Sequence, residues 1–428
     1  MPRDRLYAMS APPRPAVFQV NACLSAVLSV LFVTGGRAWA SPYEDQAAGR
    51  AAAIVSALDD RLLAAQVIFS GLDGSRNLGG AMKGLLEDCP AGGLVLFRYN
   101  LNAEKEDVKA FLAECSAFIG MNTVPSAAAL PSVADVVDAA DAALPDGASG
   151  ARPFAGIPPF IAVDHEGGPV HRFGPGVSRL PAAAFWRGLA DREGEAAALA
   201  ALEEAAFKSG TEIRELGITV NLAPVSEVLD AENLSFLDGR SFGEDPLFVR
   251  AASAAFMRGM ERAGISCTLK HFPGNTGTDP HLASQALGKD RAALEEMASP
   301  FAALIKDGRV PAVMVSHALV PAVDGERIAS LSRPVMEGWL RGGLGFGGII
   351  IADDFSMGAV RISGLDPEEA AAASLAAGAD MIMAWPSSLR KTHAAILAAL
   401  KDGRLSREAL LKSAERVVAE KIRLGLLD

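Results

Sequence analysis

The feature that most constrains this chain is a series of short apolar runs that alternate with segments of helical spacing. Runs of this length without polar alternation are typical of strands buried on both faces of a parallel sheet. Eight such strands alternating with helices favour a (β/α)8 barrel with a single catalytic domain over a doubly wound sheet. The eight runs cover residues 66–72, 93–97, 157–163, 218–222, 265–269, 310–315, 347–352 and 380–384.

The first part of the chain has the pattern of an export signal. Basic residues precede an apolar run at residues 16–34, and the sequence AWA stands at residues 38–40. Small residues at the first and third positions before a cut are the signal-peptidase pattern. We therefore predict a cleaved secretory signal over residues 1–40, a barrel over residues 41–428, and a periplasmic or extracellular location. A retained membrane anchor is the alternative, because the apolar run is close to the length that spans a bilayer.

Composition narrows the partners and the covalent chemistry. A formal net charge of -11 and a pI near 5.2 argue against nucleic acid or an anionic membrane surface as the main partner.

Residues 125–152 are rich in Ala, Pro, Asp and Ser, which predicts a surface insertion. Cys89 and Cys115 are the pair to test for a disulfide, and Cys267 is interpreted as a buried apolar residue. No spacing of cysteines and histidines suggests a zinc site.

Polar side chains follow several of the apolar runs. Asp164 follows the third run, Lys270 and His271 follow the fifth, His317 follows the sixth and Asp353 follows the seventh. Barrel enzymes carry their chemistry at the carboxyl ends of the strands, so these residues are candidates for one site. For His317 we favour a buried histidine whose hydrogen bonds are satisfied within the core.

Two features of the strand-end loops suggest acid–base and nucleophilic chemistry. In Asp279-Pro280-His281 the carboxylate can hold one imidazole nitrogen and leave the other free to exchange a proton. Asp353 is a carboxylate at the barrel mouth, as a retaining glycosidase needs for attack on the anomeric carbon. Asp354 should point elsewhere, because neighbouring residues leaving a strand alternate in direction. The alternative for Asp279 and His281 is a polar loop that contains them without a function. The alternative for Asp353 is an ordinary first residue of a loop.

Other charged residues suggest a ligand rich in hydroxyl groups. Asp164 and Glu166 stand before a Gly-Gly pair and could accept hydrogen bonds from sugar hydroxyls, although a turn stabilised by the Asp side chain would use the same residues. Arg172, Arg240 and Lys270 are cations close to predicted strand ends. Each alone is a plausible salt-bridge partner, and together they indicate an anionic or hydroxyl-rich ligand.

The motifs in combination resemble those of glycoside hydrolase family 3, and within it the single-barrel β-N-acetylglucosaminidases known from peptidoglycan recycling. The resemblance covers about residues 60 to 425 and keeps the family's order of motifs. It rests on AVDHEGGPVHRF at 162–173, NLAPV at 221–225, GRSFGEDP at 239–246, KHFPG at 270–274, DPH at 279–281 and ADDFSM at 352–357.

This resemblance implies a set of roles. Asp353 would be the nucleophile, His281 the general acid/base, and Asp279 the residue that orients His281. The reaction would be retaining hydrolysis through a covalent glycosyl-enzyme, without a metal or organic cofactor. The sugar-binding positions implied are Asp164, Arg172, Arg240, Lys270 and His271.

The chain departs from the family pattern at three points. The catalytic loop usually reads KHFPGHG, whereas Asn275 replaces that second histidine here and the loop before Asp-x-His is two residues shorter. His165 stands where glutamine is commoner. The export signal favours periplasmic or extracellular fragments over cytosolic anhydro-muropeptides.

The leading hypothesis is an exported, exo-acting β-N-acetylglucosaminidase that acts on peptidoglycan or chitooligosaccharide fragments as a monomer. A β-glucosidase or broader exo-hexosidase is an alternative, because a hydroxyl in place of an acetamido group changes few contacts. Phosphorolysis is a further variant. From a different class, the chain could be a sugar-binding barrel that has lost catalysis.

Overall fold

The structure is a computed structural model that describes residues 42–124, 156–174, 176–278, 285–308, 310–357, 360 and 364–427. The predicted signal at residues 1–40 and the predicted insertion at 125–152 lie outside the described residues. Within the described part, no helix is both long and apolar enough to span a membrane.

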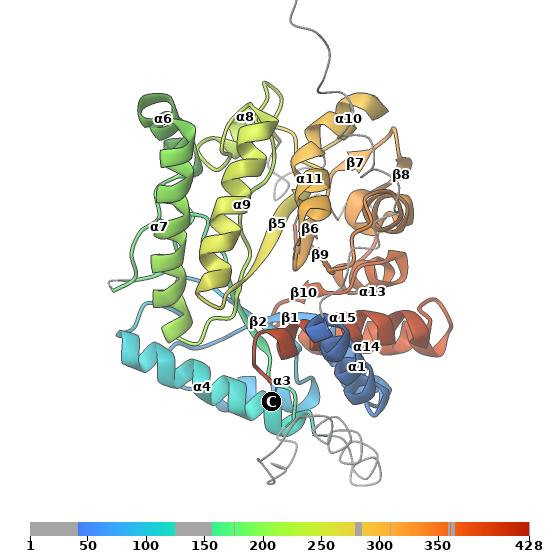
Figure 1. The fold of residues 1–428 in the computed structure, drawn as a ribbon. Coiled ribbons are helices and arrows are strands. Elements are labelled where there is room, and N and C mark those ends of the chain that lie inside the picture. Colours follow the sequence, from blue (N-terminus) through green and yellow to red (C-terminus); the bar gives the residue numbers. More distant parts are fainter. Residues whose placement is uncertain are drawn as a thin grey trace, which may run out of the picture. The chain divides into compact units, whose positions relative to one another are not determined.

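The sheet consists of parallel strands in the order β10-β1-β2-β3-β4-β5-β6-β9 (Figure 1). A bridge between Ile351 of β9 and Met381, just before β10, brings the two edge strands together and closes the barrel. Each of the eight apolar runs overlaps one strand, so the predicted (β/α)8 barrel is confirmed. The strands are β1 Ile68–Gly71, β2 Gly93–Leu96, β3 Phe160–Val163, β4 Val220–Asn221, β5 Ser266–Phe272, β6 Ala312–Val315, β9 Ile349–Ala352 and β10 Ile382–Ala384.

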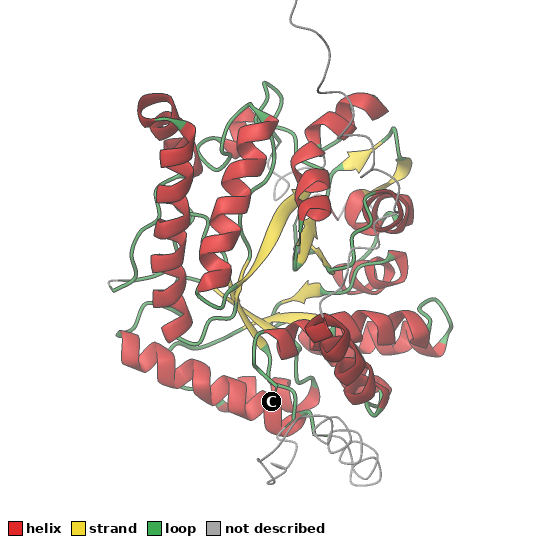
Figure 2. Cartoon of the chain, viewed as in Figure 1, coloured by secondary structure: helices red, strands yellow, loops and turns green. Residues whose placement is uncertain are grey.

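Helices surround the strands (Figure 2). They include α1 Pro42–Ser56, α2 Asp60–Gln66, α3 Gly80–Asp88, α4 Lys105–Asn122, α6 Ala183–Glu193, α7 Glu195–Glu215, α8 Leu234–Leu237, α9 Pro246–Arg262, α10 Arg291–Met297, α11 Ser299–Asp307, α13 Pro367–Ala377, α14 Leu389–Lys401 and α15 Arg407–Arg423. A 3-10 turn at Ala329–Leu331 and a π-helix at Pro334–Gly343 precede β9. Sequence analysis did not predict α6, α14, the π-helix or the antiparallel hairpin of β7 Leu319–Val320 and β8 Asp324–Ile328. It expected a loop over residues 233–246, where the structure has the short helix α8.

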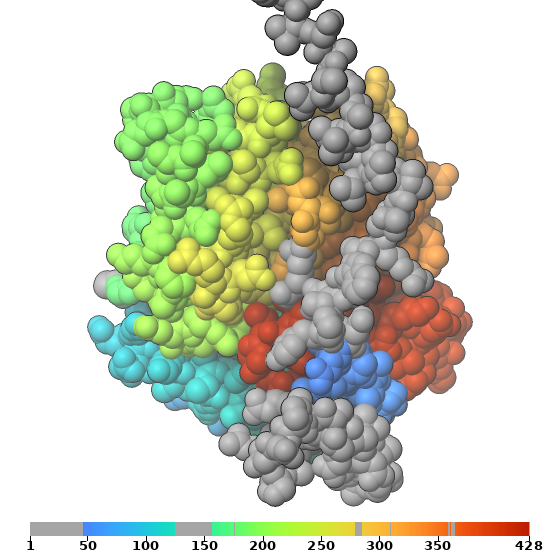
Figure 3. All heavy atoms as spheres, in the orientation of Figure 1, coloured from blue at the N-terminus to red at the C-terminus, as the bar shows by residue number. Residues whose placement is uncertain are grey.

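α2, near the start of the described chain, packs against α14 and α15 at its end, in the blue and red regions of Figures 1 and 3. Arg407 at the start of α15 places its Nε 2.7 Å from Oδ1 of Asp60, at the start of α2. Arg390 of α14 is paired with Asp88, at the end of α3, across 2.5 Å. These exposed ion pairs link helices from the start of the described chain to helices from its end.

Side chains of the strands divide between two cores, because alternate residues of a strand point to opposite faces. One set fills the barrel interior, where Phe69 and Phe160 stack with ring centroids 6.1 Å apart. The other set packs against the helices in a larger cluster. The interior cluster also contains Val417, which reaches it from α15.

α15 covers the end of the barrel where the strands begin. Its fully buried Lys421 donates from Nζ to Gln66 Oε1 across 2.9 Å and lies over the ring of Phe160, 5.2 Å from the centroid. Burial lowers the pKa of Lys421 well below its ordinary value. The opposite, carboxyl end of the barrel is the end at which the predicted site residues stand.

Cys89 and Cys115, the pair to test for a disulfide, are not bonded to each other, because both thiols are free. Cys89 follows α3 and Cys115 lies within α4, and each side chain is separately packed into the hydrophobic core. Burial raises the pKa of each thiol to about 12. The interpretation of Cys267 as a buried apolar residue is confirmed, since the side chain belongs to the same core.

Candidate active site

A cavity of about 400 Å³ opens at the carboxyl ends of the strands. Parallel strands of a closed barrel all end on this face, so residues distant in sequence converge there. Asp279 and His281 lie outside the described residues. The remaining predicted site residues all line the cavity: Asp164, Arg172, Arg240, Lys270, His271 and Asp353.

Asp353 directly follows β9, where the apolar run ends, and is half-buried. Its Oδ1 accepts a hydrogen bond of 2.9 Å from the backbone N–H of Asp354. Burial alone would raise the pKa of Asp353, but nearby His271 and His317, together with that N–H, hold it below its ordinary value. The side chain is therefore a carboxylate at neutral pH, which is the state that a nucleophile requires.

Asp354 has different partners, as the alternation of side chains along a strand predicts. Its two oxygens accept from Trp385 Nε1 at 3.1 and 3.0 Å, and Oδ2 accepts from Ser356 Oγ at 2.7 Å. Burial raises the pKa of Asp354, the opposite of the direction found for Asp353. The two adjacent carboxyl groups thus have distinct environments, which shift their pKa values in opposite directions.

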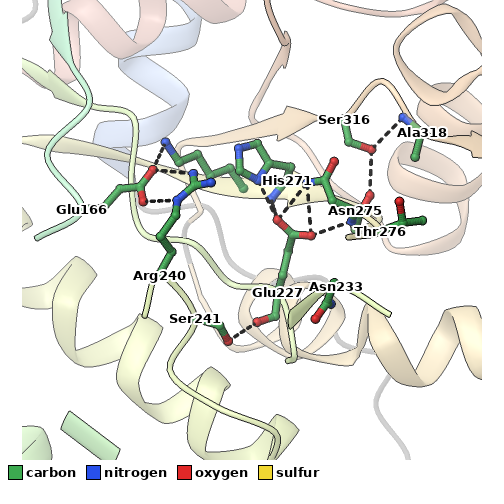
Figure 4. Close-up of polar contacts among 12 residues, drawn as sticks. Glu166, Glu227, Asn233, Arg240, Ser241, His271, Asn275, Thr276, Ser316 and Ala318 are labelled. Carbon is green, nitrogen blue, oxygen red and sulfur yellow. Dashed lines mark hydrogen bonds and ion pairs between the residues drawn. The ribbon is translucent and has the colours of Figure 1, made fainter. Parts of the chain in front are cut away.

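Buried ion pairs form one side of the cavity (Figure 4). Nζ of Lys270 lies 2.6 Å from Asp164 Oδ1 and 2.6 Å from Glu166 Oε1. Nε and Nη2 of Arg240 each donate to the Glu166 carboxylate across 2.9 Å, in a bidentate pair. Lys270 belongs to β5, which continues through His271 to Phe272 and is longer than predicted.

Glu166 lines the cavity and is held by two cations. Its side chain is 5% exposed and both oxygens are engaged by Arg240 and Lys270, so most of its acceptor positions are occupied within the protein. Burial would raise the pKa of Glu166, but the two cations outweigh burial and keep it well below the ordinary range. Asp164 is 23% exposed and remains accessible from the cavity.

Arg172 offers a hydrogen-bond donor to a ligand. Its half-buried side chain lines the cavity, and within the described part of the chain its buried Nε has no hydrogen-bond partner. A buried donor of this kind is costly to leave unsatisfied. The predicted position of Arg172 as a ligand-binding residue is consistent with this geometry.

Glu227, which sequence analysis did not identify, holds His271 from behind (Figure 4). Its side chain is 1% exposed, and Oε1 lies 2.6 Å from His271 Nδ1 and 3.2 Å from the backbone N of His271. A carboxylate can only accept, so Nδ1 carries a proton and Nε2 is the nitrogen left for the cavity. The available signal was its place after strand β4, two residues beyond NLAPV.

Asn275 extends this contact to the base of the next loop. Glu227 Oε2 accepts from the backbone N of Asn275 at 2.6 Å, and the Asn275 amide donates to both Glu227 oxygens at 3.0 and 3.2 Å. Gln285 donates to Asn275 Oδ1 across 2.6 Å and accepts from the backbone N of Thr276 at 2.7 Å. A neutral amide network therefore replaces the second histidine of the family motif.

Replacing Glu227 by Gln should lower kcat/KM by roughly tenfold or more, the value of a lost hydrogen bond to a charged group. The amide can donate to Nδ1 instead of accepting from it, which favours the wrong tautomer of His271. Steady-state kinetics on Glu227→Gln, with Glu227→Asp as the conservative variant, measures the effect. Glu232→Gln, an exposed carboxylate of the same loop, is the matched control. Unchanged kinetics at unchanged thermal stability would contradict the positioning role.

Two further histidines, His317 and His165, are buried within the protein and do not line the cavity. His317 is 1% exposed, with Nδ1 2.6 Å from Ser330 Oγ and Nε2 2.9 Å from the Asp354 carbonyl oxygen, which confirms the predicted buried histidine. His165 is fully buried, with Nε2 2.8 Å from Ser209 Oγ. Burial, together with the nearby His171, lowers the pKa of His165 to about 3, so this ring is neutral.

Comparison with known proteins agrees with the resemblance found in the motifs. The model of the glycosyl hydrolase family 3 N terminal domain matches residues 123–419. A beta-hexosaminidase of Methylococcus capsulatus is 37% identical over 279 residues, which cover 60% of this chain and 80% of that protein.

Solved structures agree as well. A glycoside hydrolase family 3 beta-N-acetylglucosaminidase from Paenibacillus sp. str. FPU-7 superposes with a TM-score of 0.70 at 30% identity, over 86% of this chain and 63% of that one. NagZ from Neisseria gonorrhoeae, in complex with N-trifluoroacetyl-D-glucosamine, has a TM-score of 0.62 at 27% identity, over 83% of this chain and 97% of that one. The chain belongs to glycoside hydrolase family 3.

Proposed function

We propose that this glycoside hydrolase is an exported, exo-acting, retaining β-N-acetylglucosaminidase that removes terminal β-linked N-acetylglucosamine from peptidoglycan or chitooligosaccharide fragments. The observation that carries the proposal is the ionised Asp353 in a cavity with Asp164, Arg172, Lys270 and His271. A volume of about 400 Å³ is at the small end of the range for ligand sites, roughly 300–1,000 Å³, as a site for a terminal sugar should be.

The proposed reaction has two steps. An oxygen of Asp353 attacks the anomeric carbon as the glycosidic C–O bond breaks, and His281 gives its proton to the leaving oxygen. Water then attacks the same carbon, His281 takes the water proton, and the ester bond to Asp353 breaks. Asp279 orients His281. A neutral histidine base is not repelled by the carboxylate released in the second step.

The N-acetyl sugar is supported by two lines of evidence. The relatives carry the names beta-hexosaminidase and beta-N-acetylglucosaminidase, and one structure holds N-trifluoroacetyl-D-glucosamine. Apolar side chains at the strand ends offer a surface for the acetamido methyl group next to the charged residues that would bind hydroxyls. These apolar lining residues are Val95, Leu222, Met314 and Met383.

Export rests on the signal pattern at residues 1–40. The protein recovered from the periplasm or the medium should then begin at Ser41. An amino terminus at Met1 in a membrane fraction would instead support a retained anchor.

Turnover of paired aryl glycosides tests the function. We expect the enzyme to hydrolyse 4-nitrophenyl N-acetyl-β-glucosaminide in preference to 4-nitrophenyl β-glucoside, and added phosphate should not divert product to a sugar phosphate. His281→Ala should lose activity that azide partly restores, because azide replaces the missing base in the second step. Preference for the glucoside would support the β-glucosidase alternative. Binding of the sugar without turnover would support a non-catalytic barrel.

A further inference from the structure

The loop that follows β3, residues 164–173, has two faces. An antiparallel bridge between Gly167 and Val170 pairs its two limbs, and the Glu166 N–H donates to the Val170 carbonyl oxygen across 3.2 Å. Along an extended limb, alternate side chains point to opposite faces. The face towards the cavity carries Asp164, Glu166, Val170 and Arg172. The other face, which we call the back face, carries the buried residues His165, His171 and Phe173, none of which lines the cavity.

The three rings of the back face pack on one another. The ring centroid of His165 lies 5.2 Å from that of His171 and 5.2 Å from that of Phe173. The centroids of His171 and Phe173 are 5.8 Å apart. His165 belongs to the first limb of the loop, whereas His171 and Phe173 belong to the second. The contacts between the rings therefore set the spacing of the two limbs.

Each histidine is also tied to a different part of the barrel. His165 Nε2 lies 2.8 Å from Ser209 Oγ of α7, and the backbone N and O of His165 bond to the side-chain amide of Asn221 of β4, each across 3.0 Å. The His171 carbonyl oxygen accepts from Arg98, just after β2, across 3.0 Å. The two limbs are thus anchored separately, and the histidine rings join them.

Both histidine rings are neutral at pH 7. Burial, together with Arg179 and Arg98, holds the pKa of His171 below its ordinary value, and the pKa of His165 is about 3. Two neutral rings in contact do not repel each other. Among the residues that the structure describes, neither Nδ1 atom has a hydrogen-bond partner. The contribution of these rings is therefore the packing of one limb on the other, together with the bond of His165 to Ser209.

We propose that His165 and His171 are positioning residues for binding of the sugar. Each is adjacent in sequence to a residue that faces the cavity, His165 to Asp164 and His171 to Arg172, and the spacing of the limbs fixes how far apart those two charged groups stand. The inference rests on the proposed function and deepens it. It assigns binding of the sugar hydroxyl groups to this loop, separately from the chemistry at Asp353.

A positioning role predicts a change in KM without a matching change in kcat. Contacts that the sugar makes equally in the ground state and the transition state affect KM alone. For His171→Ala we expect KM for 4-nitrophenyl N-acetyl-β-glucosaminide to rise by about fivefold or more, the value of one weakened hydrogen bond to a charged group. The turnover number kcat should change by less than about twofold.

Three further variants make the test specific. His171→Phe keeps a ring between the limbs and should restore most of the lost affinity. Ser209→Ala removes the partner of His165 from outside the loop, without opening a large cavity, and should raise KM by about threefold. His393→Ala is the matched control, because His393 is a buried histidine of α14 that bonds to the Arg61 carbonyl oxygen and lies away from the cavity. It should lower thermal stability and leave KM unchanged.

Other outcomes would overturn the proposal. A fall in kcat at unchanged KM, or an equal rise in KM for His393→Ala, would mean that the rings only support the fold. If the unmodified enzyme does not turn over the aryl glycoside, the proposed function fails, and hydrogen exchange then decides the positioning role by itself. In His171→Ala the amides of residues 164–173 must exchange faster, while those of α14 keep their rate. Unchanged exchange in the loop would reject the role.

Discussion

Replacing Asp353 by Asn should lower kcat by at least about a thousandfold, equivalent to roughly 4 kcal/mol of transition-state stabilisation. The amide has nearly the same shape as the carboxylate and can accept the hydrogen bond from the Asp354 N–H, so the fold should be unaffected. What it lacks is the negative charge that would attack the anomeric carbon in the proposed reaction. Steady-state kinetics on the aryl N-acetylglucosaminide measures the loss.

Asp354→Asn is the matched control, because it changes the adjacent carboxyl group. That side chain is hydrogen-bonded to Trp385 and Ser356, so its loss should cost far less activity than the loss of Asp353. A slow, 5-fluorinated N-acetylglucosaminyl substrate should add one sugar to the peptide that contains Asp353 in the unmodified enzyme and none in Asp353→Asn. A label on another peptide, or full activity in Asp353→Asn, would refute the assignment of the nucleophile.

Replacing Glu166 by Gln should destabilise the protein by about 3 kcal/mol at pH 7, within the usual range for breaking a buried ion pair. The substitution leaves Arg240 without a carboxylate partner, while Lys270 keeps Asp164. Because the Glu166 side chain is 5% exposed, solvent screens the interaction weakly. Urea unfolding followed by circular dichroism gives the free energy of unfolding of both proteins.

The difference in free energy of unfolding between the unmodified protein and Glu166→Gln should also become smaller as the pH falls. The folded state holds the pKa of Glu166 below its ordinary value, because the charges of Lys270 and Arg240 outweigh the effect of burial. Its stabilisation is therefore complete above the unfolded pKa, about 4.3, and is lost as the pH falls below that value towards the folded pKa. The gap between the two proteins should narrow in acid. Glu408→Gln, which breaks the exposed pair with Lys412, should change little at either pH. A gap that is constant with pH would contradict the ion-pair account.

Local patterns predicted the barrel because its strands are buried on both faces. Each strand is then a continuous apolar run, visible without any knowledge of its neighbours, as in Ile349–Ala352 of β9. The helix at Pro367–Ala377 was predictable for a similar reason, since proline at its first position and Gly378 in the left-handed region after its end are local signals. The hairpin of β7 and β8 carries no such signal, because it is short and partly exposed.

Those residues of the candidate site that directly follow a strand could be predicted from the sequence. The described residues Asp164, Lys270, His271 and Asp353 reach one cavity because all parallel strands of a barrel end on the same face. Whether Cys89 and Cys115 form a disulfide could not be decided from the sequence, because a sequence does not show that they pack as separate core residues. The ion pairs of Glu166 with Arg240 and Lys270 were not predictable, because the two cations come from distant segments of the chain.

The fold class, the family and the identity of the residues at the mouth of the barrel can all be predicted from the amino-acid sequence. These depend on local apolar runs and on short motifs, which are properties of neighbouring residues. The partner of each side chain becomes visible only in the folded protein: Glu227 contacts His271, Arg240 pairs with Glu166, and Tyr99 stacks on Phe97. The physical reason is that an ion pair, a tautomer or a stacked ring depends on distances of a few ångströms and on side-chain direction. Those are set when the barrel closes and brings the ends of its strands together.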